Sequence, residues 1–235
     1  MPPRIAAGEV FDRSGQIRRP PIWFLLREVA IDLTYLPPAP SASGVPDGRG
    51  HVVLVIPAFL TTDRVTRHLR RFLQSCGYRS FGWGLGVNWG PTERLATGLR
   101  RRLAELRGLA GHPVSVIGLS LGGVLARDLA YDAPHDVRQV ITIASPFNLP
   151  TATPLEPLVR LAACFFRPAI DVSRLASPLP VRSTAIFTRD DGLVAWQSCR
   201  RDDDNGHAVE VAGPHLTICR NPDVLRTVAL ALGPP

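Results

Sequence analysis

A run of β-branched residues turns directly into a helical pattern in the middle of this 235-residue chain. The run Val114–Leu119 ends within the segment Gly118-Leu119-Ser120-Leu121-Gly122-Gly123. Apolar residues then recur at helical spacing as far as Tyr131. A serine at a sharp strand-to-helix turn is held in a strained backbone conformation that exposes its hydroxyl. Side chains at positions 118 and 122 would collide where strand and helix fold back on each other. The stretch therefore predicts a nucleophile at the end of a buried strand.

Apolar segments alternate with amphipathic segments along most of the chain. We expect strands at residues 51–57, 79–85, 114–119, 137–145, within 181–192 and at 207–213. We expect a helix at 63–76, capped by Thr62 or Thr61, and a second helix that Pro91 and Thr92 open and that carries a leucine stripe to 106. Two more are expected at 121–131 and, with Asn221 as N-cap and Pro222 as first residue, as far as about 233. Buried strands that alternate with helices predict the α/β class, with a mainly parallel sheet flanked by helices.

A serine hydroxyl needs a base that removes its proton and an acid that orients the base. In an open α/β sheet both groups follow later strands, in the chain order Ser, then Asp or Glu, then His. Asp190 and Asp191 follow the segment STAIF, and His215 follows HAVEVAG. The sequence therefore predicts a triad of Ser120, one of the two aspartates and His215.

The remaining candidates fit this order less well. His207 begins the last expected strand and would lie at the opposite edge of the sheet. The other histidines precede the acid candidates and are expected at the surface or in packing: His51, His68, His112 and His135. The run Asp202-Asp203-Asp204 lies in a polar turn and is expected to be a solvated loop.

An oxyanion that forms beside the serine needs two backbone N–H donors. Leu121 follows the serine at the positive end of a helix and is expected to provide one of them. The segment IPAFLTTD follows the first strand, and there the N–H of Phe59 is our first choice and that of Leu60 the second.

Composition excludes several other functions. The formal charge is +7, but the basic residues are all arginines, scattered and not interleaved with aromatic residues, so we expect no nucleic-acid partner. No apolar run is long enough to span a membrane. The proposed chemistry needs no metal or other cofactor, and no C-x-x-C pair is present. Cys199 and Cys219 flank a short strand and could approach each other, but without a secretion signal we expect reduced thiols and a cytoplasmic protein.

With these motifs in place, the chain resembles the α/β-hydrolase superfamily, and in particular its small bacterial lipase- and esterase-like members. The segments that carry the resemblance are VLVIPAFLTTD, GYRSFGWGLGVNWGP, VIGLSLGG, IASPFN, TRDDGLVAW and GPHLTICRNPDV. In such proteins the acid directly precedes a Gly-x-Val step, which favours Asp191 over Asp190, and the histidine lies in a turn like GPHL, which matches His215. The Pro-Gly-Phe that is frequent after the first strand is Pro57-Ala58-Phe59 here.

The resemblance also implies an organisation of the chain. The resemblance assigns residues 51–235 to the catalytic domain, whereas the residue pattern itself predicts an arm at 1–50 with a short amphipathic helix at 22–33. The proline-rich segment 146–180, with a helix at 157–166, is expected to be either a cap over the pocket or a surface excursion at the sheet edge. Phe59, Leu60 and Trp83 are candidate pocket walls.

We therefore expect a carboxylic-ester hydrolase of the esterase or lipase type that acts on a small ester or lipid-like molecule. An acyltransferase or thioesterase would use the same triad, and a non-catalytic binding protein could keep the same fold. The sequence leaves open the oligomeric state.

Overall fold

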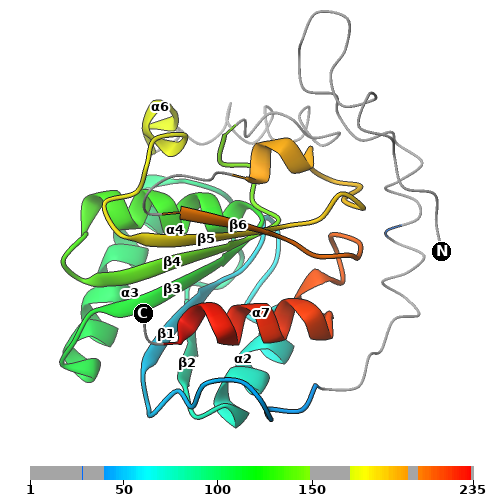
Figure 1. The fold of residues 1–235 in the computed structure, drawn as a ribbon. Helices are drawn as coiled ribbons and strands as arrows, with labels where there is room; N and C mark the ends of the chain where they lie inside the picture. The colour runs from blue at the N-terminus through cyan, green and yellow to red at the C-terminus, as the bar shows by residue number, and fades with distance from the viewer. Residues whose placement is uncertain (1–27, 29–39, 149–169, 201–205, 234–235) are drawn as a thin grey trace, which may run out of the picture.

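Six parallel strands form one sheet in the order β2-β1-β3-β4-β5-β6 (Figure 1). The structure is a computed structural model that describes residue 28 and residues 40–148, 170–200 and 206–233. The strands are β1 (Val52–Ile56), β2 (Arg79–Gly82), β3 (Val114–Leu119), β4 (Val137–Ile143), β5 (Arg182–Phe187) and β6 (Gly206–Glu210). Every neighbouring pair is parallel, which confirms the predicted class.

Helices cover both faces of this sheet. They are α2 (Arg67–Ser75), α3 (Glu93–Ala110), α4 (Leu121–Asp132), α6 (Val172–Leu175) and α7 (Pro222–Leu232), with 3-10 turns η2 (Trp196–Cys199) and η3 (Ile218–Arg220). Strand β1 explains why both faces need a cover, because all five of its residues are buried. Val53 and Val55 pack in the cluster that α2 and α7 complete, whereas Val52, Leu54 and Ile56 pack in the cluster of α3 and α4. A strand buried on both faces reads as the continuous apolar run seen in the sequence.

Two helices begin after a side-chain cap, of which the sequence predicted the one at Asn221. The Thr92 side chain accepts a hydrogen bond from the N–H of Leu95 at 3.3 Å, so α3 begins one residue later, at Glu93. Asn221 Oδ1 accepts from the N–H of Asp223 at 2.8 Å, with Pro222 as the first helical residue of α7. Both are the side-chain caps that satisfy otherwise unpaired N–H groups.

The start of α2 differs from the expectation. The helix begins at Arg67, after Thr66, and neither Thr61 nor Thr62 caps it. The side chain of Asp63 is instead committed to the next loop, where its carboxylate oxygens accept from the N–H groups of Trp83 and Gly84, each at 3.0 Å. Residues 63–66 form turns, because this segment is tied to the end of β2 before the helix begins.

The described end of the expected cap segment is attached to α4. Arg127 in α4 donates to the carbonyl oxygens of Leu175 and Ser177, and Arg174 pairs with Asp128. Leu175 is fully buried, so residues 170–180 are part of the folded body. The expected helix at 157–166, and all of the expected arm helix except Glu28, lie outside the described residues. The division into arm, catalytic domain and cap stays a prediction.

Candidate active site

Ser120 stands between the last residue of β3 and the first residue of α4. Its backbone has φ 51° and ψ −121°, a conformation that non-glycine residues rarely adopt. The Ser120 N–H donates to the carbonyl of Ile143 at 2.8 Å, and the N–H of Gly123 donates to the Ser120 carbonyl at 2.9 Å. These two bonds hold the turn on both sides, so the surrounding fold maintains a strain of about 1–3 kcal/mol.

Glycines make this turn sterically possible, although not entirely in the expected way. A Cβ on Gly118 would overlap the backbone of Gly122 and Gly123, as predicted for strand and helix folding back on each other. A Cβ on Gly122 would instead overlap the carbonyl oxygens of Ile56 and Pro57. Gly122 is therefore required by the loop after β1, which passes directly beside the serine turn.

Asp191 and His215 come from the loops that follow β5 and β6. His215 Nδ1 and Asp191 Oδ2 are 2.7 Å apart, and the two side chains are 6% and 1% exposed. The other oxygen of Asp191 accepts from the N–H groups of Leu193 and Val194, each at 2.8 Å. These contacts fix the carboxylate against the imidazole.

The electrostatics of His215 reflect this pairing. Burial lowers the pKa of the imidazole, but the charge and hydrogen bond of Asp191, together with the charge of Glu28, outweigh burial, so that the pKa of His215 lies above its ordinary value. The site therefore favours an imidazolium, which a general base becomes after it takes a proton.

Asp190 has a different set of partners. Its Oδ2 accepts from the N–H of Gly213 at 3.2 Å, and its own N–H donates to Thr188 Oγ1. Thr188 in turn donates to the Gly213 carbonyl at 2.8 Å. Asp190 thus ties the loop after β5 to the loop after β6, and it does not contact the imidazole.

The parallel sheet brings the predicted site residues to one edge. Ser120, Asp191 and His215 each follow the carboxyl end of a strand, and all these strands run in the same direction. The direct contact is that between Asp191 and His215; the Ser120 hydroxyl makes no hydrogen bond to the described part of the chain. His207, by contrast, lies within β6 near its amino end, as expected.

The loop after β1 carries the predicted oxyanion donor. Leu60 has a positive φ of 57°, and its N–H donates to the Asn88 carbonyl at 2.8 Å, so this second-choice donor is occupied. The N–H groups of Phe59 and Leu121 have no acceptor in the described part of the chain. Ala58 is not among the residues with positive φ, so the change from glycine at this position introduces no such strain.

Asn88 is a residue that sequence reasoning did not single out. It is fully buried, its Nδ2 donates to the Pro57 carbonyl at 2.8 Å and its Oδ1 accepts from Gly90. Its backbone N–H also donates to the carbonyl of Thr61. A Cβ on Gly90 would lie 3.8 Å from Phe59 and 3.9 Å from Leu121, so the Asn88 loop lies against both predicted donor residues. The only sequence signal is the polar residue between glycines in GLGVNWG.

Trp83 does not line the site. Its side chain is fully buried in the cluster of α3 and α4, and its Nε1 donates to the carbonyl of Gly86. The expectation of a pocket wall at this position is wrong, because the indole completes the core beneath β2. Cys199 and Cys219 are buried free thiols.

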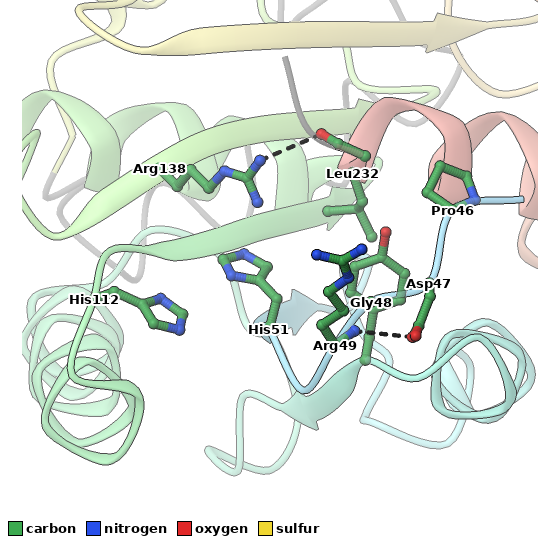
Figure 2. A pocket seen from close by; sticks show the side chains of 10 residues that line it. Pro46, Asp47, Gly48, Arg49, His51, His112, Arg138 and Leu232 are labelled. Carbon is green, nitrogen blue, oxygen red and sulfur yellow. Dashed lines mark hydrogen bonds between the residues drawn. The ribbon is translucent and has the colours of Figure 1, made fainter.

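A cavity of about 440 Å³ opens at the other end of the sheet (Figure 2). Its lining includes Arg49, His51, His112 and Arg138, which precede or begin strands, and the last residue of α7. The rings of His51 and His112 stack with centroids 5.0 Å apart. Because these residues lie at the amino edge of the sheet, the cavity is separate from the site at Ser120.

Two further observations concern the described residues. They contain no group of three or more His, Cys, Asp or Glu side chains arranged to hold a metal ion. None of their helices is both long enough and apolar enough to cross a membrane.

Comparisons with solved structures identify the fold of the chain. No protein-family model and no curated protein matches the chain. It is similar to the mature lipase BlEst2 of Bacillus licheniformis, with TM-score 0.58, 14% identity, and coverage of 83% of this chain and 95% of that one. It is also similar to a monoacylglycerol lipase of Paleococcus ferrophilus, with TM-score 0.58, 16% identity, and coverage of 80% of this chain and 95% of that one. The thioesterase domain of the curacin biosynthetic pathway matches with TM-score 0.53, 14% identity, and coverage of 82% of this chain and 93% of that one. The chain has the α/β-hydrolase fold.

Proposed function

We propose that this protein is a serine hydrolase that cleaves carboxylic esters, with Ser120 as nucleophile, His215 as base and Asp191 as the orienting acid. The observation that carries the proposal is the buried Asp191–His215 pair, which lies at the same sheet edge as the strained Ser120 turn. A hydrogen-bonded acid and imidazole at the same sheet edge as a strained serine turn is an arrangement suited to acyl transfer.

In the proposed reaction, Ser120 Oγ bonds to the ester carbonyl carbon while His215 Nε2 takes the hydroxyl proton. The carbonyl electron pair moves to oxygen, where the N–H groups of Phe59 and Leu121 stabilise it. Collapse of this intermediate breaks the bond to the leaving alcohol, which receives the proton from His215. Water then attacks the acyl-serine, with His215 again as base, and releases the carboxylic acid and free Ser120.

The surroundings support an apolar substrate. Leu60 and Trp89 are 44% and 51% exposed, and they lie on the two hydrogen-bonded loops beside Phe59. Large apolar side chains exposed next to a reactive group can bind an acyl chain or an apolar alcohol. We therefore propose an ester or lipid-like substrate with an apolar part.

A fluorophosphonate probe tests the proposed nucleophile. Wild-type protein should label covalently, and Ser120→Ala should not, whereas Ser177→Ala, a control at an exposed serine, should label like wild type. Failure of the wild type to label, or equal labelling of Ser120→Ala, would overturn the proposal. The alternative function, a non-catalytic binding protein with the same fold, would then remain.

Product analysis then separates hydrolysis from the alternatives. We expect p-nitrophenyl esters to yield free acid even when alcohol or thiol acceptors are added. Predominant transfer to an acceptor would identify an acyltransferase, and preference for thioesters over matched oxygen esters would identify a thioesterase.

A further inference from the structure

A buried carboxylate from the start of the chain reaches the two loops of the proposed acid and base. Glu28 is 1% exposed and lies 187 residues before His215. Its Oε1 accepts from the N–H of His215 at 2.7 Å and from the N–H of Gly192 at 2.9 Å, and its Oε2 accepts from the N–H of Leu216 at 2.9 Å. One carboxylate therefore holds three backbone groups.

These three groups belong to the loops that carry Asp191 and His215. Gly192 is the residue after Asp191, and its N–H precedes those of Leu193 and Val194, which Asp191 itself binds. Glu28 therefore accepts from the N–H of Gly192, which Asp191 does not bind, and also from the N–H of His215. It connects the backbones of the two loops while their side chains connect through the 2.7 Å Asp191–His215 contact.

The charge of Glu28 is unusual for a buried group. No Lys, Arg or His forms an ion pair with it within the described residues. A buried carboxylate is costly unless hydrogen bonds replace the water it loses, and three backbone N–H donors do so here. Two charged groups act on His215: Asp191 from the loop after β5, and Glu28. Both raise the pKa of the imidazole.

We infer that Glu28 is a positioning residue for the proposed acid–base pair, which fixes the His215 loop against the Asp191 loop and supplies a second negative charge that stabilises the imidazolium. This inference rests on the proposed function for its catalytic consequence. Its structural content, a carboxylate bound to three amides beside His215, is tested independently of activity.

Glu28→Gln separates the charge from the shape of the side chain. The amide oxygen can keep the bonds to Gly192 and His215, but the NH₂ group would face the N–H of Leu216. We expect kcat to fall roughly 10- to 100-fold with KM little changed, because a small displacement of a catalytic group has effects of this size. The acid limb of kcat/KM should move to lower pH, since the imidazole loses a charge that favours its protonated form.

Two variants serve as comparisons. Glu210→Gln removes the same charge from an exposed position on β6, where Glu210 pairs with Arg189, and should leave both kcat and the pH profile as in wild type. Glu28→Asp keeps the charge but shortens the reach, so that kcat should fall while the acid limb stays near its wild-type position. A role confined to folding would give Gln and Asp variants the same pH profile.

Two measurements need no turnover. In NMR titrations the assigned His215 ring should have a lower pKa in Glu28→Gln than in wild type, and the amides of Gly192, His215 and Leu216 in wild type should exchange far more slowly than that of exposed Gly86. A folded Glu28→Gln with an unchanged His215 pKa overturns the inference. Rapid exchange of the three wild-type amides overturns it even if Glu28→Gln does not fold. Failure of the wild type to label with a fluorophosphonate would remove the proposed function while these measurements still test the contact.

Discussion

The imidazole of His215 is bound to Asp191, at 2.7 Å, although the adjacent Asp190 carries the same carboxyl group. Asp190 instead accepts from the N–H of Gly213. We expect Asp191→Asn to lower kcat by about 10³- to 10⁴-fold, because an amide in this position can favour the wrong imidazole tautomer and stabilises the imidazolium less. Asp190→Asn should cost less than about tenfold, since only a loop contact changes. Steady-state kinetics with a p-nitrophenyl ester measure both. Equal losses in the two variants would contradict the assignment.

The Gly118 position should tolerate no side chain. Gly118→Ala places a Cβ against the backbone of Gly122 and Gly123, which cannot move without displacing α4 from β3. We expect the variant to lose about 3 kcal/mol or more of unfolding free energy. Gly108→Ala is the matched control, because its Cβ meets nothing within 4 Å in α3, and it should gain up to about 1 kcal/mol. Urea denaturation compares them; a Gly118→Ala protein as stable as wild type would show that the turn can relax.

The serine turn and the sheet were predictable because they depend on local and repeated features of the sequence. Buried parallel strands are continuous apolar runs, and the order of Ser120, Asp191 and His215 follows from the direction of the chain through the sheet. The choice of Asp191 over Asp190 came from the resemblance to a family. Charge and spacing alone left the two aspartates equivalent.

Other features depend on contacts between distant segments and leave little trace in the sequence. Glu28 looks like any charged residue on an amphipathic helix, and its partners follow 164 to 188 residues later. Asp63 looks like the first residue of a helix, yet its side chain binds the N–H groups of Trp83 and Gly84. In both cases the backbone groups that the carboxylate satisfies become known only when the chain is folded.

Asn88 should matter for the loop after β1, which carries the proposed oxyanion donor Phe59. Asn88→Ala leaves the Pro57 carbonyl and the Gly90 N–H without their partner in a fully buried position, which costs about 1–3 kcal/mol for each unsatisfied group. We expect kcat to fall by more than tenfold while KM changes little, because Asn88 supports the loop of Phe59, the proposed oxyanion donor. Gln74→Ala is the control, since it removes an amide-to-carbonyl bond to Ser80 near the amino end of β2. If Asn88→Ala loses stability but keeps its kcat, Asn88 does not help to position the N–H of Phe59.

Leu60 and Trp89 should set the preference for apolar esters. Leu60→Ser and Trp89→Ser are expected to lower kcat/KM for long acyl chains by roughly 10-fold or more and to leave short-chain esters nearly unaffected, because burial of a large apolar side chain contributes about 1.5–3 kcal/mol. Leu109→Ser and Leu230→Ser change two equally exposed leucines, 50% and 54%, on α3 and α7. These controls should show wild-type chain-length profiles. Profiles that shift equally in all four variants would contradict a local binding role.

His51 should make stability depend on pH at the amino edge of the sheet. Burial lowers the pKa of His51 to about 4, with smaller effects in the same direction from the charges of Arg138 and His112. The Nε2 of His51 lies 2.8 Å from Ser115 Oγ. Between pH 6.5 and about 4 the unfolded chain binds a proton at this position that the folded chain does not bind. The contribution of the neutral His51 to the free energy of unfolding is therefore complete above pH 6.5 and is lost as the pH falls towards 4.

His51→Gln removes this titration and tests its sign. Between pH 7 and pH 5 the wild type should lose about 1 kcal/mol more unfolding free energy than His51→Gln, a figure that allows for the partial exposure of the ring to solvent. Because the acidic groups titrate in both proteins, the difference between the two losses isolates His51. His207→Gln, at an exposed position on β6, controls for the removal of any histidine and should follow the wild type. If His51→Gln loses as much stability as wild type, or more, the imidazole is not kept neutral by its surroundings.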